Sequence, residues 1–378
     1  MIVLTVCRKC VCDERIPNIT FDSEGVCNYC RIQEQMDAEY PTGAKGEQHL
    51  RELAEKIKKD GKGRDYDCII GVSGGCDSSY LCWYAKEKLG LRPLAAHFDN
   101  TWNSKIAVEN IKNVLAKLDM DLFTYVMDND EFNDMARSML KSSIPNADAL
   151  TDIAFATTLY MAADKHRVKH ILEGSSFRTE GVGPVGWLYF DGKMIQSIHK
   201  KFGSAPMDRY PNLWLMKWMK WLLKGIKQYR PIYYMDYHKE EVKRFLTEKL
   251  DWQWYGGHHM ENRFTLFNNN YLFPKKFNID YRYIEFSALV RSGQMTREQA
   301  VEELKIPLTF DDEILVEILK RLGLSREEFD AIMALPPKTY RDYKTYNRTF
   351  RMMRPIFWVM YKSDMVNRNF YIKYTKKW

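Results

Sequence analysis

The sequence predicts an α/β protein with a doubly wound parallel sheet, preceded by a zinc-binding module and followed by a mainly helical C-terminal region. Four short apolar segments alternate with helical patterns between residues 68 and 172, as in βαβ units. Two Cys-x-x-Cys pairs stand within the first 30 residues. Near the other end, Thr296 with Gln299 and Ser325 with Glu328 have the spacing of helix capping boxes.

The cysteine pairs predict a closed metal site. All eight cysteines lie between Cys7 and Cys82, and four of them form CRKC and CNYC, with residues 11–26 between the pairs. Four thiolates at this spacing suit tetrahedral Zn²⁺, which lets a segment too small for its own core fold. Disulfides or a redox pair are the alternatives. We expect structural zinc, with no open position for catalysis, on Cys7, Cys10, Cys27 and Cys30.

Residues 67–81, DCIIGVSGGCDSSYL, predict an anion site. An apolar, β-branched strand at residues 68–72 leads into a glycine turn, and a helix follows at about residues 80–89. Glycines let a phosphate approach the backbone, successive N–H groups form a nest, and the helix N-terminus adds partial positive charge. The serines add hydroxyl donors, and Asp77 suits an Mg²⁺ ion that bridges to the phosphates.

The run Ser-Gly-Gly-x-Asp-Ser at residues 73–78 resembles the PP-loop of the N-type ATP pyrophosphatases, which split ATP into AMP and pyrophosphate. It is not a Walker loop, because no Gly-Lys-Ser/Thr follows the turn. The alternative is a serine-rich turn without a ligand. The resemblance implies a HUP-like PP-loop ATPase fold, with pyrophosphate and Mg²⁺ bound by Ser73, Gly74, Gly75, Asp77 and Ser78.

Polar residues follow two other predicted strands. Residues 93–98 are followed by Asp99 and Asn100, which we expect to bind the nucleoside, because ligands of open α/β sheets lie beyond the carboxyl ends of strands. After residues 168–172 we expect Glu173 or Glu180 to act on a proton or Mg²⁺, and Arg178 to meet a phosphate. Arg178 and Glu180 are also our assignments for contact with the substrate. A helix-capping Asp99 and a solvated loop after residue 172 are the alternatives.

Two segments of the second half are distinctive. In residues 254–265, WYGGHHMENRFT, two glycines precede His259 and Glu261, which suit proton transfer or the orientation of a substrate amide. Residues 212–230, NLWLMKWMKWLLKGIKQYR, predict a basic, Trp-rich amphipathic helix. Such a helix can lie on a membrane or dock a partner. A packed helix with a lysine stripe is the interpretation we favour.

Composition and charge leave the class of partner open. The net charge of +7 favours an anionic partner, which ATP and a phosphorylated substrate satisfy as well as nucleic acid does. Since no apolar run approaches the length of a membrane span, we expect a cytoplasmic location. We expect a zinc module at residues 1–40, the ATP pyrophosphatase domain with insertions at 41–285, and a helical region with a basic, aromatic tail at 286–378.

From Cys7 to about Leu304 the chain resembles the N-acetyl sugar amidotransferase family, which includes enzymes of the WbpG and PseA type. Besides the cysteine pairs and residues 73–78, the resemblance rests on DNTWN at 99–103, GGHHME at 256–261, KKFNID at 275–280 and SGQMTR at 292–297. A lysine is common in the family where His258 stands here. The resemblance implies that ATP adenylates the oxygen of an acetamido group and that ammonia then displaces AMP. The product is an acetamidino sugar for lipopolysaccharide O-antigen or flagellar nonulosonic acids.

The resemblance also implies partners. A fused glutaminase needs a nucleophilic cysteine, yet residue 2 is Ile2 and no cysteine follows Cys82. We therefore expect ammonia from a separate glutaminase like that of imidazole glycerol phosphate synthase, with a cyclase-like companion. The sugar substrate is expected to be nucleotide-linked, and no stable nucleic-acid complex is expected. The alternative is a tRNA-modifying enzyme of the thiolation type, a class that also combines zinc knuckles with a PP-loop, and the basic charge of this chain suits RNA. Such enzymes generally use further cysteines in the later part of the fold, and this chain has none there.

Overall fold

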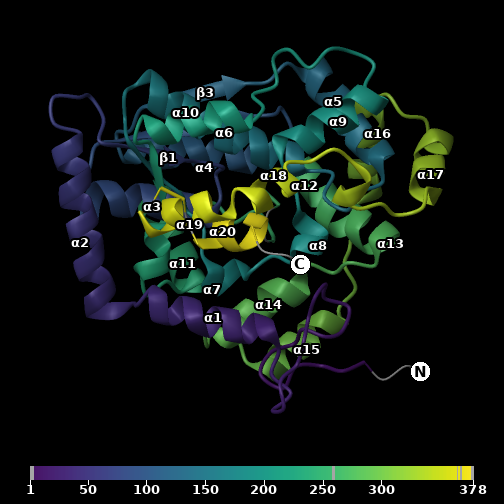
Figure 1. Cartoon of the computed structure of the whole chain (residues 1–378), viewed down its shortest axis with the longest axis horizontal. Helices are drawn as coiled ribbons and strands as arrows, with labels where there is room; N and C mark the ends of the chain where they lie inside the picture. The colour runs from purple at the N-terminus through teal and green to yellow at the C-terminus, as the bar shows by residue number, and fades with distance from the viewer. Residues whose placement is uncertain (1–3, 258–259, 364, 367, 376–378) are drawn as a thin grey trace.

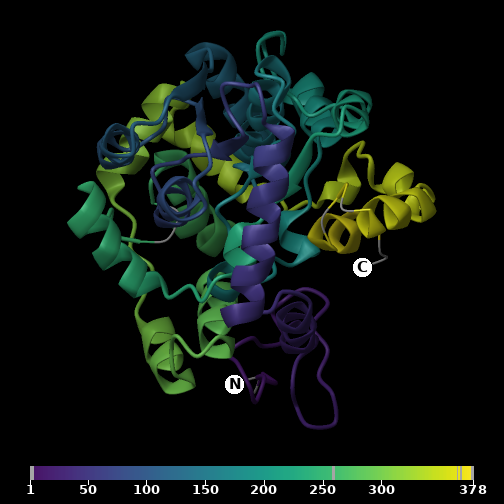
Figure 2. The same cartoon turned by 90° about the vertical axis from the view of Figure 1, so that its left-hand side faces the viewer.

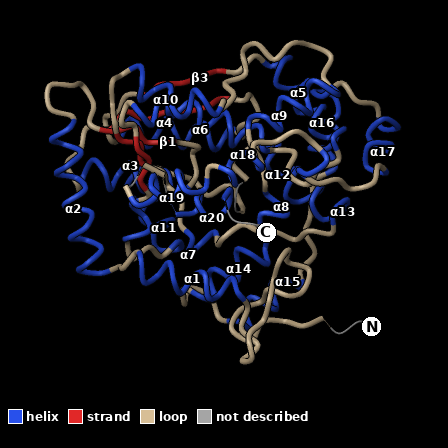
Figure 3. Tube along the Cα trace, in the orientation of Figure 1, coloured by secondary structure: helices blue, strands red, loops and turns tan. Residues whose placement is uncertain are grey.

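The computed structural model describes residues 4–257, 260–363, 365–366 and 368–375 (Figure 1). Its centre is a five-stranded sheet in the order β3-β2-β1-β4-β5, in which every neighbouring pair is parallel. Helices surround this small sheet (Figure 3). The predicted doubly wound parallel sheet is thus confirmed. The strands are β1 Cys68–Gly71, β2 Pro93–Asp99, β3 Leu122–Val126, β4 His170–Leu172 and β5 Lys227–Tyr229.

The fifth strand corrects one prediction. The helix expected at residues 212–230 is shorter, because α10 (Leu215–Leu223) ends before Gly225, whose φ of +81° breaks the helix. The chain then enters β5, which pairs with β4. As the favoured interpretation required, the helix is packed, with Trp218, Trp221 and Leu222 buried.

The two faces of the sheet pack against different helices, because successive side chains of a strand point to opposite faces. Cys68 and Ile70 of β1 join a core with α2 (Gly43–Asp60), α3 (Cys76–Trp83), α4 (Lys105–Lys117) and α11 (Lys239–Leu250). Ile69, between them, joins the opposite core with α6 (Ala149–Lys165) and α10. Strand β1 is therefore buried on both sides, which explains its continuous apolar sequence.

A second body of helices lies to the right of the sheet in Figure 1. It packs around buried aromatic rings such as Phe132, Phe264 and Phe329. The predicted capping boxes at Thr296 and Ser325 are present, and the mainly helical C-terminal region is confirmed. The helices of this body are α5 (Asn129–Ser142), α9 (Gly192–Phe202), α12 (Arg263–Phe267), α13 (Phe273–Phe277), α16 (Asp312–Leu322) and α17 (Arg326–Ala334).

The remaining helices connect these parts. Within the described ranges, none of the helices is both long and apolar enough to span a bilayer. The predicted domain boundary after residue 285 falls inside α14. These helices are α1 (Asn28–Glu39), α7 (Phe177–Glu180), α8 (Val185–Leu188), α14 (Arg282–Arg291), α15 (Arg297–Lys305), α18 (Asn347–Met352), α19 (Arg354–Lys362) and α20 (Arg368–Thr375), with short π or 3-10 turns η1 (Tyr84–Lys88), η2 (Pro231–Tyr234), η3 (Asn268–Leu272) and η4 (Tyr340–Asp342).

Candidate active site and metal centre

The glycine turn after β1 has the geometry of an anion nest. Gly74 has a φ of +80°, and a β-carbon there would lie 2.3 Å from the carbonyl oxygen of Ala107, so only glycine fits. Its own carbonyl is held by Asn110 Nδ2 at 3.2 Å and Trp252 Nε1 at 2.9 Å. Helix α3 begins at Cys76, directly after the turn. The turn is thereby fixed with a helix N-terminus beside it, as phosphate binding requires.

Asp77, in the first turn of α3, is 8% exposed. Its carboxylate accepts a hydrogen bond from the Tyr237 hydroxyl and lies 3.9 Å from Nζ of Lys239. Burial disfavours the charged ammonium, but the carboxylates of Asp77, Glu285 and Glu180 together outweigh this effect and raise the pKa of Lys239. A positive charge therefore stands beside the loop. Neither Tyr237 nor Lys239 was predicted as a site residue.

Gln294 holds the segment that carries these two residues. Its Nε2 donates to the carbonyl oxygen of Tyr237 at 3.0 Å, and its Oε1 accepts from the backbone N–H of Lys239 at 3.1 Å. Three residues on, Arg297 donates to the carbonyl oxygens of Cys10 and Cys7. The SGQMTR segment thus connects the cysteine module to the loop of Asp77.

If the loop turns over ATP, as its resemblance to the PP-loop implies, replacing Gln294 with methionine is expected to lower the kcat by about tenfold, because a misplaced Lys239 no longer faces Asp77. Gln299→Met is the control: it removes a hydrogen bond of 2.8 Å at the start of α15, away from the loop. Steady-state AMP formation by both variants tests this expectation, which fails if they lose activity equally.

A cavity of about 690 Å³ lies beside the loop, at the carboxyl ends of β1 and β4. The sheet order puts the topological switch between these two strands, where open α/β sheets bind ligands. The cavity brings together five of the predicted site residues, namely Ser73, Ser78, Glu173, Glu180 and Glu261.

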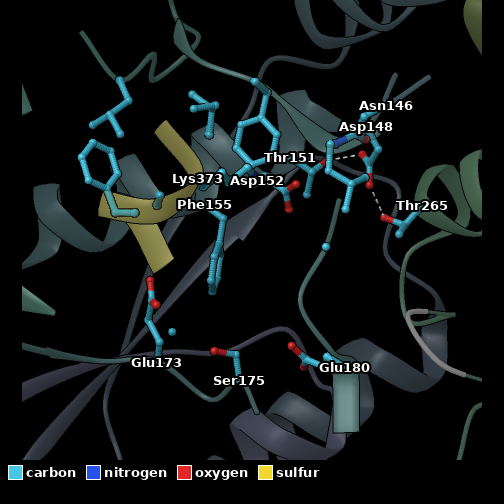
Figure 4. A pocket seen from close by; sticks show the side chains of 18 of the residues that line it. Asn146, Asp148, Thr151, Asp152, Phe155, Glu173, Ser175, Glu180, Thr265 and Lys373 are labelled. Carbon is cyan, nitrogen blue, oxygen red and sulfur yellow. Dashed lines mark hydrogen bonds between the residues drawn. The ribbon is translucent and has the colours of Figure 1, made fainter. Parts of the chain in front are cut away.

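The opposite side of the cavity comes from helices that carried no predicted site. Figure 4 shows Glu173, Ser175 and Glu180 along one edge, with Asp152 of α6 and Lys373 of α20 across from them. Burial lowers the pKa of Lys373 to about 8. The C-terminal tail, to which the sequence assigned no chemistry, therefore forms one wall.

A hydrogen-bonded carboxylate closes the far corner of the cavity. Asp148 accepts from the hydroxyl of Thr151 and from that of Thr265, each at 2.6 Å, as the dashed lines in Figure 4 show. These bonds join the start of α6 to α12. All three side chains line the cavity with Asn146, so this corner offers both donors and acceptors.

Glu173 lines the cavity, where its carboxylate forms an ion pair. Its Oε2 is 2.7 Å from Nη2 of Arg230, and its Oε1 accepts from Gln228 Nε2 at 3.1 Å. Although burial disfavours the cation, this carboxylate raises the pKa of Arg230. Nε and Nη1 of Arg230 are buried and meet no hydrogen-bond partner in the described part of the chain. Arg230 was not predicted as a site residue, because the preceding residues of β5 were assigned to a helix. Gly225 was the signal that the helix ends earlier.

Two predicted contacts are corrected. Arg178 does not line the cavity: its guanidinium is held by Asp37 Oδ1 at 2.8 Å and by the carbonyl oxygens of Tyr233 and Tyr40 at 2.6 and 2.8 Å. It joins α7 to α1 rather than meeting a phosphate. Asn100 is fully buried, and its amide group bonds Thr151 and Asn262, so it supports the fold rather than a nucleoside.

Asp99 ends β2, and its Oδ1 accepts from the backbone N–H of Thr101 at 2.8 Å. This bond shapes the turn, and the cavity is lined instead by its neighbours His97 and Asn103. Burial lowers the pKa of His97, so the ring is neutral. Its Nε2 lies 3.2 Å from Asn103 Nδ2.

Glu261 reaches the loop from a distant part of the chain. A β-carbon added at Gly75 would lie 3.5 Å from Oε1 of Glu261 and 3.4 Å from the Tyr255 hydroxyl. The backbone carbonyl of Glu261 also accepts from the N–H of Ser104 at 2.8 Å, which ties this segment to the chain after β2. His259, the other predicted residue of this segment, lies outside the described residues.

The four predicted metal ligands come together at the N-terminus. The Sγ atoms of Cys7, Cys10, Cys27 and Cys30 lie within 4.8 Å of one another, and all four side chains are buried. Such a group of thiols can hold a metal ion or an iron–sulfur cluster. The module packs on α14, where Ser287 Oγ accepts from the N–H of Val11 at 3.3 Å. Cys12 is 3.2 Å from the same hydroxyl and is not one of the four.

Comparison with known proteins finds a family match for one part of the chain. Residues 261–356 match the family described as "LPS biosynthesis protein WbpG-like, C-terminal domain". The matched segment begins at Glu261 and includes Asn262, Thr265 and Tyr281 of the cavity. Among curated proteins, "Uncharacterized protein MJ1599" of Methanocaldococcus jannaschii is 24% identical over 321 residues, which cover 84% of this chain and 99% of that protein.

Solved structures show weaker similarity. NMN synthetase from Francisella tularensis is 13% identical with a TM-score of 0.32, covering 78% of this chain and 98% of that one. The NH3-dependent NAD synthetase from Campylobacter jejuni is 14% identical with a TM-score of 0.33, covering 82% and 98%. The U34-tRNA thiolase NcsA from Methanococcus maripaludis, solved with its 4Fe–4S cluster, is 15% identical with a TM-score of 0.33, covering 85% and 99%. Similarity at this level leaves the reaction undecided.

Proposed function

Because this chain carries a WbpG-like C-terminal domain and is thereby related to the WbpG-type proteins, we propose that it is an ATP-dependent amidotransferase acting on an acetamido sugar. The amide oxygen attacks the α-phosphorus of ATP, and pyrophosphate leaves. Ammonia adds to the carbon of the resulting O-adenylyl imidate, and AMP departs with the former amide oxygen, which leaves an amidinium group. The observation that carries the proposal is one cavity lined by Ser73 and Ser78 of the loop and by Glu261 of the WbpG-like domain, with the Glu261 carboxylate beside Gly75.

The loop residues take the phosphate end of this reaction. Backbone N–H groups from Gly74 to Ser78 and the hydroxyls of Ser73 and Ser78 suit the oxygens of the leaving pyrophosphate. Lys239 adds positive charge from the side of Asp77. The Asp77 carboxylate offers the oxygen donor that Mg²⁺ prefers, and a bound Mg²⁺ would neutralise charge on the phosphates.

The acceptor sugar belongs in the space between Glu173, Ser175 and Glu180 and the wall with Asp152 and Lys373. Carboxylates suit sugar hydroxyls as hydrogen-bond acceptors, and they also favour the positive amidinium group of the product. Glu261, beside Gly75, is suited to accept the proton that ammonia loses as the carbon–nitrogen bond forms. We propose a sugar precursor of a bacterial surface polysaccharide as the substrate.

Ammonia has to come from outside the chain. The three cysteines after the metal group, Cys68, Cys76 and Cys82, are buried, and burial raises the pKa of Cys76 and of Cys82 to about 12. A glutaminase cysteine needs the reverse, a thiolate that substrate can reach. We therefore propose a separate glutaminase partner with a cyclase-like companion. The same thiols argue against a sulfur-transfer reaction on tRNA.

Zinc is our proposal for the four thiolates. With zinc–sulfur bonds of about 2.3 Å, tetrahedral geometry separates neighbouring sulfurs by about 3.8 Å. The three short Sγ pairs, Cys7–Cys30, Cys10–Cys27 and Cys27–Cys30, are 3.8, 3.8 and 3.6 Å apart. A 4Fe–4S cluster distributes its thiolates over four iron atoms and needs a wider group.

The test is AMP release from ATP and Mg²⁺, with ammonium chloride and a panel of acetamido sugars in free, UDP-linked and CMP-linked form. We expect AMP only when ammonium and one sugar are both present, and mass spectrometry should find NH in place of one oxygen in that sugar. Bulk tRNA is the comparison acceptor. AMP formation stimulated by tRNA and by no sugar would overturn the proposal.

Lys373→Met is expected to raise the KM for the sugar by about tenfold while leaving the KM for ATP unchanged, because the lysine faces the acceptor end of the cavity. Lys344→Met, at an exposed lysine of the same C-terminal region, is the control and should change neither constant. Equal KM values for Lys373→Met and wild type would remove Lys373 from the acceptor site.

The same variant has a pH signature. The pKa of Lys373 is about 8 in the folded chain and 10.5 ordinarily. Between these two pH values Lys373 is protonated in the unfolded chain but not in the folded chain, so the free energy of unfolding of the wild type rises with pH. Lys373→Met should lack that gain and be more stable below pH 8, by on the order of 1–2 kcal/mol. Burial also lowers the pKa of Lys276 to about 8, so Lys276 adds the same pH dependence to both proteins. The quantity to measure is therefore the difference in free energy of unfolding between Lys373→Met and wild type at each pH.

A further inference from the structure

Two adjacent helices expose apolar side chains on one side of the molecule. The inner faces of α10 and α19 share a hydrophobic cluster, in which the rings of Trp218 and Phe357 stack with centroids 6.1 Å apart. Figure 2 shows α10 (teal) and the C-terminal helices (yellow) on the same, right-hand side. The apolar residues on the outer faces, 50–78% exposed, are Met216, Leu223, Ile356, Trp358 and Val359.

The same face is strongly basic. Helices α10, α18 and α19 together contain six Lys or Arg, all exposed, and no acidic residue. Lys217, Lys220, Arg351 and Lys362 are exposed on α10, α18 and α19. Within the described ranges, none of these four forms an ion pair.

We propose that this face, formed by α10, α18 and α19, binds the surface of an anionic lipid bilayer. Exposed Ile356, Trp358 and Val359 would enter the boundary between headgroups and acyl chains, while the lysines and arginines meet lipid phosphates. The positive charge of the face favours an anionic bilayer as the partner. A second copy of the chain is disfavoured, because two such faces would bring like charges together. The proposal is independent of the reaction, since none of these residues lines the cavity.

The test is sedimentation of the full chain with vesicles of phosphatidylcholine, with or without one third phosphatidylglycerol. We expect binding to the anionic vesicles alone, weakened about tenfold or more when salt is raised from 0.1 to 0.5 M, because surface charge is then screened. Lys220→Gln with Arg351→Gln should weaken binding similarly. A chain that stays in the supernatant with anionic vesicles overturns the proposal.

A matched pair of variants separates this face from the general surface. Ile356→Asp with Val359→Asp places carboxylates where the bilayer would sit, at positions 51% and 58% exposed, and should abolish vesicle binding. Val316→Asp, at a position 66% exposed on α16, should bind like wild type. Equal loss in both would contradict the proposal. A second result would also contradict it. If the wild type self-associates in ultracentrifugation but does not bind vesicles, and the double variant no longer self-associates, the face binds a second copy of the chain.

Discussion

Replacing Asp77 with asparagine is expected to lower ATP-dependent AMP formation by about 10³-fold, because the amide keeps the shape of the carboxylate and loses its charge. The amide oxygen of this variant would still accept from the Tyr237 hydroxyl, so the fold of the loop should persist. The proposed reaction places a metal ion and two leaving phosphates at this position, where a neutral side chain cannot balance the charges. Single-turnover AMP release under saturating ATP is the measurement.

Asp236→Asn provides the control for Asp77. Asp236 belongs to the same segment as Tyr237, but its side chain is 79% exposed and contacts His238. We expect wild-type turnover from this variant. Thermal unfolding of both variants checks that the chain is folded. If Asp77→Asn retains turnover within tenfold of wild type, the loop has no part in the chemistry.

Cys10→Ser is expected to release the metal and lower the free energy of unfolding by several kcal/mol, since metal binding to four thiolates supplies folding energy to so small a module. The effect should extend beyond the module. Arg297 binds the carbonyl oxygens of Cys7 and Cys10, and the neighbouring Gln294 positions Lys239 beside Asp77. We therefore expect ATP turnover to fall as well.

Cys12→Ser is the matched control for Cys10→Ser. Cys12 is buried two residues further along, in contact with Ser287, and is not one of the four grouped thiols. Metal analysis should find one zinc per chain in wild type and in Cys12→Ser, and little in Cys10→Ser. Iron with a visible absorption band would overturn zinc. Equal metal content in all three proteins would overturn the site itself.

The sequence predicted the parts whose signals are local. A strand, a glycine turn and a helix start follow one another within residues 68–83, so the loop could be identified from adjacent residues. The four cysteines fall in two tetrapeptides, each flanked by an isolated β-bridge, Val6–Asp13 or Phe21–Cys27. The N–H of Arg8 donates to the carbonyl oxygen of Gly25 at 3.0 Å and so joins the two segments. The three residues of β5 were missed, because Lys-Gln-Tyr has no apolar pattern of its own and takes its conformation from β4.

Side-chain roles were less predictable than elements. Arg178 follows a strand, as a phosphate ligand would, yet its guanidinium donates to three acceptors within the protein. These are the Asp37 carboxylate of α1, the carbonyl oxygen of Tyr233 in η2 and that of Tyr40 just after α1. Asn100 likewise stands at a strand end but is fully buried. Arg230 and Lys373, 143 positions apart, line the same cavity. Which distant residues line the same cavity depends on which helices pack together. A single sequence does not show these long-range contacts.

By itself, the sequence determined the parallel α/β fold, the group of four thiols and the glycine loop after β1, because strand periodicity, Cys-x-x-Cys spacing and a glycine turn are short-range properties of the chain. Only the tertiary structure decided what surrounds the loop: Glu261 beside Gly75, Lys239 beside Asp77, and a wall from the C-terminal helix. The physical reason is that a cavity belongs to the packing of distant elements. Its lining is fixed when cores from both faces of the sheet and the C-terminal helices close around it.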